Sequence, residues 1–300
     1  MKKIKGLACQ TITWSNYKIA EIINDVSDLR FEGIEVPAEL ITSSNMNWNE
    51  VQSLAKHKNV QIIAVYQTAR LGNRDYAVRK YELGKCKLLI EMLLSLGIKY
   101  LIIGDPPTDE NDDCVVLAET LQKLGAFARM KNVKLCYHPH RGSIVESSDQ
   151  VERLLSLTDP ENLSLCLDTG HIYWGGGAPS EVIQRFFDRV AYIQFKDVRK
   201  RPLSFIEKVA EVTKIIGLNA DRRKKFRDIG LTLLENKGPI ITEIGRGDVD
   251  FLSVIKQLEK NYYDGWITLE LDIPTVIPKL AMKRCLSHIR RLMQSIEKNE

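Results

Sequence analysis

The sequence lacks any apolar run long enough to cross a membrane, because no segment approaches the roughly 18 uninterrupted apolar residues that a spanning helix needs. Its basic start is typical of a signal peptide, but the apolar stretch that follows is too short and too polar. Its six cysteines include no C-x-x-C pair, and Cys9, Cys136 and Cys166 lie in apolar runs. These absences predict a cytoplasmic protein without membrane contact and with reduced cysteines in its core.

The sequence also has little net charge and no marked linker. The formal net charge is +4 over 300 residues, which gives little reason to expect nucleic acid as a partner, because such proteins concentrate basic charge on one face. The most basic run, residues 221–228, is interpreted as a solvated helix, with a lid as the alternative. Repeats, low-complexity tracts and linkers rich in proline, serine or glycine are missing, so residues 1–300 are expected to form one domain.

What the sequence does contain is an alternation of short apolar runs with helical patterns. Hydrophobic residues make up 44% and charged residues 27%, which is ordinary for a globular protein. Eight β-branched runs are expected to be parallel strands buried on both faces: residues 4–10, 33–37, 60–66, 100–105, 133–138, 163–168, 190–197 and 266–271. Helices are expected over residues 75–97, 113–130, 147–157, 180–187, 251–260 and 279–297. The pattern predicts an α/β fold, a single (β/α)8 TIM barrel with an extended connection between strands 7 and 8.

Polar residues gather where these apolar runs end, which is where barrels of this kind build their active sites. They are His138, His140 and Glu146 after the fifth run, Asp168 and His171 after the sixth, Gln194 and Lys196 in the seventh, Glu270 and Asp272 after the eighth, and Glu35 and Glu39 near the second. Several carboxylates around one mouth repel one another unless a cation neutralises them. Carboxylates with one amide suit Mn²⁺ or Mg²⁺. We therefore expect a divalent metal site with Glu146, Asp168, Gln194 and Glu270 as ligands.

Several of these residues, and the glycines that follow Asp168, also have a simpler interpretation. Asp168 could be only the N-cap of the next helix. His138 and His140 could simply form hydrogen bonds at the barrel rim. Gln194 points into the barrel or out of it depending on strand register, and the glycines at 175–177 could form only a flexible turn.

Seven stretches, taken together and in this order, resemble the xylose-isomerase-like barrels, a superfamily of sugar-phosphate isomerases and epimerases, and within it the myo-inosose dehydratases. They are "ACQTITWSN", "GIEV", "YHPHRGSIVES", "LCLDTGHIYWGGG", "VAYIQFKDVR", "RGDVDF" and "GWITLELD". The resemblance implies one divalent ion, Mn²⁺ first and Mg²⁺, Co²⁺ or Zn²⁺ as alternatives, held by a Glu, an Asp, a His and a second Glu. Carried over, these positions are Glu146, Asp168, Gln194 and Glu270. Gln194 departs from the family, in which many members have a histidine there.

The chemistry that such a site supports is removal of a proton from the carbon beside a ketone, with the enediolate stabilised by the metal. Glu270, His138, His140 and His171 are the candidate acids and bases, and Lys196 is expected to polarise a substrate oxygen. From the resembling stretches, Trp14, Glu35 and Arg246 are expected to bind substrate.

The substrate would be a small keto-polyol or keto-sugar. We expect β-elimination, as in an inosose-dehydratase-like lyase. The alternatives are a sugar isomerase or epimerase, the catalytic subunit of an enzyme that cleaves C-glycosides through a 3-keto-glycoside, and a non-catalytic sugar-binding barrel. The second of these alternatives, the C-glycoside-cleaving enzyme, implies a small second subunit, and a homo-oligomer is also compatible with the sequence. A DNA-repair endonuclease is disfavoured, because its three-zinc site needs many imidazoles and the chain has only five histidines.

Overall fold

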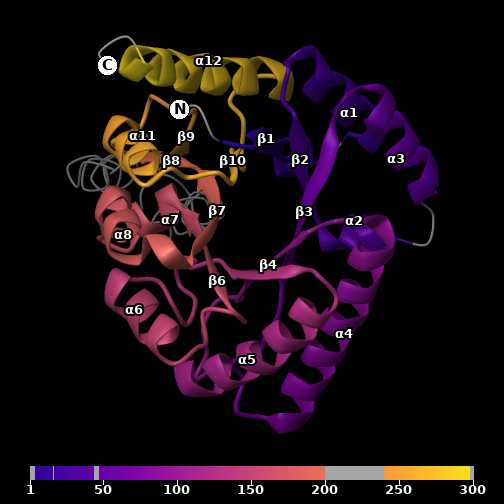
Figure 1. Ribbon diagram of the computed structural model, residues 1–300, viewed down its shortest axis with the longest axis vertical. Helices are drawn as coiled ribbons and strands as arrows, with labels where there is room; N and C mark the ends of the chain where they lie inside the picture. Colours follow the sequence, from indigo (N-terminus) through magenta and orange to yellow (C-terminus); the bar gives the residue numbers. More distant parts are fainter. Residues whose placement is uncertain (1–3, 16, 44–46, 200–239, 298–300) are drawn as a thin grey trace, which may run out of the picture.

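The computed structural model describes residues 4–15, 17–43, 47–199 and 240–297. Eight parallel strands close into a barrel in the order β1-β10-β7-β6-β5-β4-β3-β2, with helices around it (Figure 1). The strands are β1 Gly6–Gln10, β2 Gly33–Pro37, β3 Gln61–Thr68, β4 Tyr100–Gly104, β5 Lys134–Tyr137, β6 Ser164–Asp168, β7 Val190–Phe195 and β10 Trp266–Leu269. Each predicted run contributes one of these strands, and the predicted (β/α)8 barrel is confirmed. No helix in the described part of the chain has the length and apolarity needed to span a bilayer.

Six helices occupy the predicted ranges within a few residues. They are α4 Tyr76–Leu96, α5 Cys114–Met130, α6 Ser148–Ser156, α8 Pro179–Phe186, α11 Phe251–Lys260 and α12 Pro278–Glu297. The prediction missed α1 Ile19–Asp28, α2 Ala38–Thr42, α3 Trp48–His57 and α7 Thr169–Trp174, together with the 3-10 turns η1 Thr11–Trp14 and η2 Phe187–Arg189. In α1 the buried residues Ile19, Ile22, Ile23 and Val26 have the spacing of an amphipathic helix, so its signal was present in the sequence.

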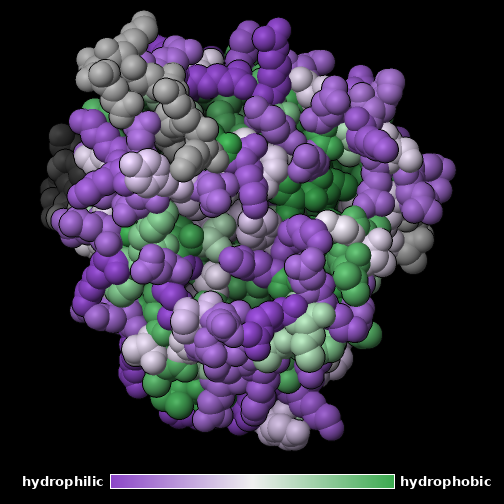
Figure 2. All heavy atoms as spheres, viewed as in Figure 1, coloured by the Kyte–Doolittle hydropathy of each residue, from purple (hydrophilic) through white to green (hydrophobic). Residues whose placement is uncertain are grey.

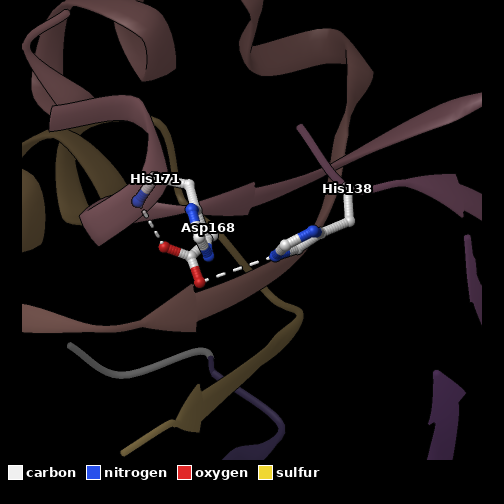
Figure 3. Close-up of side chains that lie close together, drawn as sticks. All are labelled: His138, Asp168 and His171. Atoms are coloured by element: carbon white, nitrogen blue, oxygen red, sulfur yellow. Dashed lines mark hydrogen bonds and ion pairs between the residues drawn. The ribbon is translucent and has the colours of Figure 1, made fainter. Parts of the chain in front are cut away.

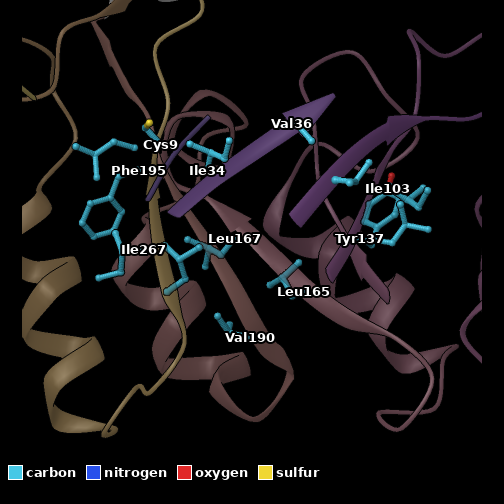
Figure 4. Packing of buried hydrophobic residues seen from close by; sticks show 14 of the residues in the cluster. Cys9, Ile34, Val36, Ile103, Tyr137, Leu165, Leu167, Val190, Phe195 and Ile267 are labelled. Atoms are coloured by element: carbon cyan, nitrogen blue, oxygen red, sulfur yellow. The ribbon is translucent and has the colours of Figure 1, made fainter. Parts of the chain in front are cut away.

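Side chains alternate between the barrel interior and the layer under the helices. The interior cluster contains Ala8, Ala64, Tyr100, Cys136, Cys166, Tyr192 and Trp266. The intervening positions pack outward with the helices and include Cys9, Ile34, Leu165, Leu167, Phe195 and Ile267 (Figure 4). Because the period of a strand is two, side chains two residues beyond the interior positions face the mouth of the barrel. Polar side chains cover most of the outer surface that Figure 2 shows.

All six cysteines are free. Five are buried and Cys114 is half-buried, which agrees with the predicted core role for all but that residue.

The connection between β7, which ends at Phe195, and β10, which begins at Trp266, is long, as predicted. Its first strand, β8 Asp197–Arg199, pairs antiparallel with β9 Ile240–Thr242, so its two described ends lie side by side. The Asp197 carboxylate accepts hydrogen bonds from the backbone N–H groups of Gly245, Gly247 and Val249, which ties the returning chain to the strand it left. Residues 200–239, including the basic run at 221–228, lie outside the described residues.

Candidate active site

Five buried polar side chains meet at the carboxyl ends of four neighbouring strands. Asp168 is the last residue of β6, His138 follows β5 directly, and Glu270 follows β10 directly. The other two are Lys196, between β7 and β8, and His171, in α7. Each is at most 5% exposed. Four of them lie an even number of residues beyond an interior position, as strand alternation requires, while His171 is brought in by α7.

A pocket of about 410 Å³ opens beside this group. Among its lining residues are Tyr66, His138, His140, Lys196, Glu270 and Asp272. The volume falls within the range of small-molecule sites. A ligand of sugar size would therefore touch the buried polar group.

Asp168 lies between two histidines (Figure 3). Its Oδ1 accepts a hydrogen bond of 2.8 Å from the backbone N–H of His171 and so caps α7. Its Oδ2 lies 3.6 Å from His138 Nε2. One potential ligand atom from each of Asp168, His138 and His171 lies within 4.8 Å of the others. Asp168 is therefore a helix cap and also a member of the cluster.

Lys196 carries a buried positive charge among the acids. Its Nζ lies 2.7 Å from Glu270 Oε1, 3.3 Å from Asp272 Oδ2 and 3.6 Å from Asp168 Oδ2. Burial alone would lower the pKa of Lys196, but these three carboxylates outweigh it and hold that pKa well above its ordinary value. Burial opposes ionisation of Asp168 as well, yet Lys196 and the histidines lower its pKa. The site thus holds an ammonium beside an ionised Asp168.

His140 and His171 are neutral. Burial, followed by the charges of His138 and Lys196, lowers the pKa of His140 to about 4. His140 Nδ1 lies 2.8 Å from the carbonyl oxygen of Arg141; because a carbonyl only accepts, Nδ1 carries the proton and Nε2 keeps the lone pair. Burial and Lys196 lower the pKa of His171 well below its ordinary value, and its two ring nitrogens face two donors, the Arg141 N–H and Lys196 Nζ.

These residues fit a divalent metal ion. Buried polar atoms without a hydrogen-bond partner include Asp168 Oδ2, Glu270 Oε2 and both ring nitrogens of His138. Burial and the neighbouring carboxylates raise the pKa of Glu270 well above its ordinary value, although Lys196 opposes this. If Asp168, Glu270 and Asp272 were all ionised, Lys196 would balance one of the three negative charges. A divalent cation would offset the other two. Imidazole with carboxylate suits Zn²⁺ and Mn²⁺ alike.

Of the four predicted metal ligands, only Asp168 belongs to the cluster of potential ligand atoms among the described residues, and Glu270 lies beside it, paired with Lys196. Glu146 is half-buried in the loop before α6, where its Oε2 accepts a hydrogen bond from the backbone N–H of Gly142. Glu146 does not belong to the cluster of potential metal ligands among the described residues. The member of that cluster that follows β5 is His138. Gln194 faces the barrel interior: its Nε2 donates to Glu35 Oε1 at 2.8 Å, and its Oε1 lies 3.3 Å from Cys166 Sγ.

The three predicted substrate-binding residues do not meet at the pocket. Trp14 is buried in the core, and its indole N–H donates to Asp25 Oδ2 of α1. Arg246 is exposed and pairs with Glu243. Glu35 is fully buried in β2, beneath the site.

Sequence reasoning also missed a pocket residue. Tyr66 lies edge-on to the His138 ring, with 5.5 Å between the ring centroids. Tyr66 ends the third predicted run, so the strand-end rule that collected the other site residues would have found it.

Comparisons with known proteins agree with this architecture. An inosose dehydratase of Clostridium perfringens is 35% identical over 158 residues, which cover 52% of this chain and 46% of that protein. The chain thus aligns with about half the length of that relative. An inosose dehydratase of Clostridium beijerinckii is 24% identical over 90% of both chains.

Two solved structures share the fold. The structure of an L-ribulose 3-epimerase superposes with a TM-score of 0.74 and 12% identity, covering 98% of this chain and 96% of that one. The structure of the IolI protein with a bound zinc atom superposes with a TM-score of 0.70 and 14% identity, covering 97% of both. The family model described as xylose isomerase-like TIM barrel matches residues 23–292, and the chain belongs to that family.

Proposed function

We propose that the protein is a divalent-metal-dependent enzyme that removes the proton beside the ketone of a keto-polyol or keto-sugar and then eliminates water, as an inosose dehydratase does. The observation that carries this proposal is the buried set of carboxylate, imidazole and ammonium groups at the carboxyl end of the barrel, beside a pocket of about 410 Å³. The inosose dehydratases among its relatives support the choice of reaction.

His140 is proposed as the base. It lines the pocket, it is uncharged because burial lowers its pKa to about 4, and its Nε2 lone pair is free of the Arg141 carbonyl. A neutral imidazole whose orientation is fixed by a second hydrogen bond can accept a proton from carbon without first losing its own. The proton would pass from the carbon beside the ketone to His140 Nε2.

Lys196 is proposed to stabilise the negative charge that develops on the substrate oxygen. It lines the pocket, and Glu270, Asp272 and Asp168 keep it charged. A positive charge that is already in place and largely shielded from water costs little reorganisation when the oxygen becomes an anion.

His138 and Asp168 would hold the divalent ion, with the unpartnered Oε2 of Glu270 as a further ligand. The bound ion would supply Lewis acidity toward the ketone oxygen. Mn²⁺ remains the first choice and Zn²⁺, Mg²⁺ and Co²⁺ the alternatives.

The carbanion has two possible fates. If the hydroxyl on the next carbon leaves with a proton as water, the product is unsaturated and the enzyme is a lyase. If a second acid or a water molecule instead delivers a proton to the opposite face of the same carbon, while His140 keeps the first proton, the product is an epimer. The epimerase folds among the structural neighbours make epimerisation the second candidate.

Incubation with Mn²⁺, and in parallel with Zn²⁺, Mg²⁺ or Co²⁺, and a panel of keto-inositols and keto-sugars in D₂O, followed by NMR, tests the proposal. Deuterium should enter beside the ketone, and a dehydrated product should accumulate. An epimer that forms without loss of water would establish the second candidate.

The variant His140→Gln should lower the rate of deuterium exchange by about 100-fold. His57→Gln, a change in an exposed histidine of α3, is the matched control and should leave exchange unchanged. The proposal fails if no substrate of the panel exchanges with any of the four metals, or if His140→Gln exchanges as fast as the control.

A further inference from the structure

The opposite end of the barrel has a second, basic pocket, here called the floor pocket. It has a volume of about 320 Å³ and is lined by Lys5, Lys99, Arg129, Lys134, Tyr100 and Asn162, among others. Lys5, Lys99 and Lys134 lie at or just before the first residues of β1, β4 and β5. The site described above lies at the last residues of the strands, so the two pockets lie at opposite ends of the barrel.

The positive charges of the floor pocket are poorly balanced. It contains four basic side chains and one acidic one, Glu161, and Glu161 already pairs with Arg129. Within the described part of the chain, no carboxylate lies within ion-pairing distance of Lys5, Lys99 or Lys134. Like charges gathered around a concavity repel one another, and an anion between them relieves that repulsion.

The lysines converge from different sides of the barrel. β1 and β4 are separated by β2 and β3 in the closed sheet, yet Lys5 Nζ lies 3.4 Å from the hydroxyl of Tyr100 in β4. β4 and β5 are neighbours, with Tyr100 paired to Lys134 in register. The ammonium of Lys5 thus reaches the strand pair from which Lys99 and Lys134 project.

Neutral polar groups complete the pocket. Tyr100 is 9% exposed and presents its hydroxyl beside Lys5. The hydroxyl of Tyr100 beside the ammonium groups offers a directed donor that a phosphate group accepts, while the lysines supply charge.

We propose that the floor pocket binds a small anion with more than one phosphate group, of the diphosphate class, away from the catalytic pocket. Lys5, Lys99 and Lys134 have no carboxylate partner among the described residues, and the several negative charges of two linked phosphates balance them better than those of a single phosphate. The proposal does not depend on which reaction the opposite end performs.

Titration calorimetry with inorganic pyrophosphate in metal-free buffer tests this site. Saturable binding is expected, and it should weaken as KCl is raised, because the contacts are between charged groups. Lys99→Gln and Lys134→Gln should each raise the Kd at least fivefold, while Lys80→Gln, at an exposed lysine of α4, should leave it unchanged. His138→Ala should also leave it unchanged, since it alters only the catalytic end.

A measurement on the unaltered protein guards against variants that fail to fold. Pyrophosphate should protect Lys99 and Lys134, but not Lys80, from acetylation by acetic anhydride, as read by mass spectrometry. The proposal is overturned if pyrophosphate does not bind saturably, if the Kd of both floor variants equals that of Lys80→Gln, if His138→Ala abolishes binding, or if the three lysines are acetylated alike with and without pyrophosphate.

Discussion

Asp105 offers a direct test of the electrostatics under the barrel mouth. It follows β4 and is 4% exposed, and its Oδ2 accepts a hydrogen bond of 2.5 Å from the Tyr137 hydroxyl while its Oδ1 has no partner. Burial raises the pKa of Asp105 from 3.8 to about 7, against the hydrogen bond from Tyr137. The variant Asp105→Asn keeps the shape and the acceptor for Tyr137 but removes the charge.

The size and sign of the effect follow from that shift. Below pH 4 the carboxyl is protonated in both the folded and the unfolded protein, so the raised pKa has no effect on stability. Between pH 4 and 7 only the folded protein keeps the proton, and the free energy of unfolding falls as pH rises. A shift of about three pKa units corresponds to at most about 4 kcal/mol. The amide nitrogen of Asn would remain unpartnered, which costs about 1 kcal/mol or more, so we expect a net gain of about 1 to 3 kcal/mol above pH 7.

Urea denaturation of both proteins at pH 4.5, 6 and 8 measures this gain. Asp105→Asn should be the more stable protein at pH 8, and its advantage should shrink steadily toward pH 4.5. A variant that is less stable than the parent at pH 8, or an advantage that does not change with pH, would refute the reasoning, because either result means that Asp105 is not a buried carboxylate that resists ionisation.

Three further predictions concern the site and its support. Lys196→Met leaves buried carboxylates without their ammonium and should cost about 3 to 5 kcal/mol in urea denaturation at pH 8; a cost below 1 kcal/mol would contradict the charge balance described here. His138→Ala should weaken Mn²⁺ binding by about tenfold or more in calorimetry, whereas Glu146→Gln should stay within about twofold; the reverse order would restore Glu146 as the ligand. Gly125→Ala places a methyl group against the backbone oxygen of Asn162 and should lower thermal stability by about 1 to 3 kcal/mol, whereas Gly84→Ala, which meets nothing, should not.

The barrel could be predicted because its strands are buried on both faces. Runs such as residues 100–103 stay apolar at consecutive positions, so they stand out from the helices between them. Short elements were harder to predict. α7 is only six residues long, and its start depends on the Asp168 side chain accepting from the His171 N–H, a contact for which sequence gives only the residue type.

For the metal ligand after β5 the sequence-based prediction is Glu146, whereas the proposal above uses His138, to which strand alternation points. Leu135 and Tyr137 pack outward, whereas Cys136 belongs to the interior cluster. His138, two residues beyond Cys136, therefore projects into the mouth, while Glu146 lies well past the strand. The prediction of Glu146 rests on the preference of Mn²⁺ and Mg²⁺ for carboxylates, whereas the choice of His138 rests on this periodicity. Gln194 could not be placed from sequence for a different reason, because its partner Glu35 lies 159 residues away in the chain.

Asp168 and Glu270 share one arrangement, in which one carboxylate oxygen is held by the protein and the other has no hydrogen-bond partner. Asp168 Oδ1 accepts a hydrogen bond from the backbone of α7, and Glu270 Oε1 pairs with Lys196 Nζ. The other two oxygens, Asp168 Oδ2 and Glu270 Oε2, have no hydrogen bond. The engaged oxygen fixes the direction of the carboxylate, so the free oxygen needs no reordering to bind a cation. Burial makes an unpaired charge costly, and a divalent ion would remove that cost at both acids at once. Lys196 balances one negative charge, so when Asp168 and Glu270 are both ionised a second charge remains, and a bound cation would offset it.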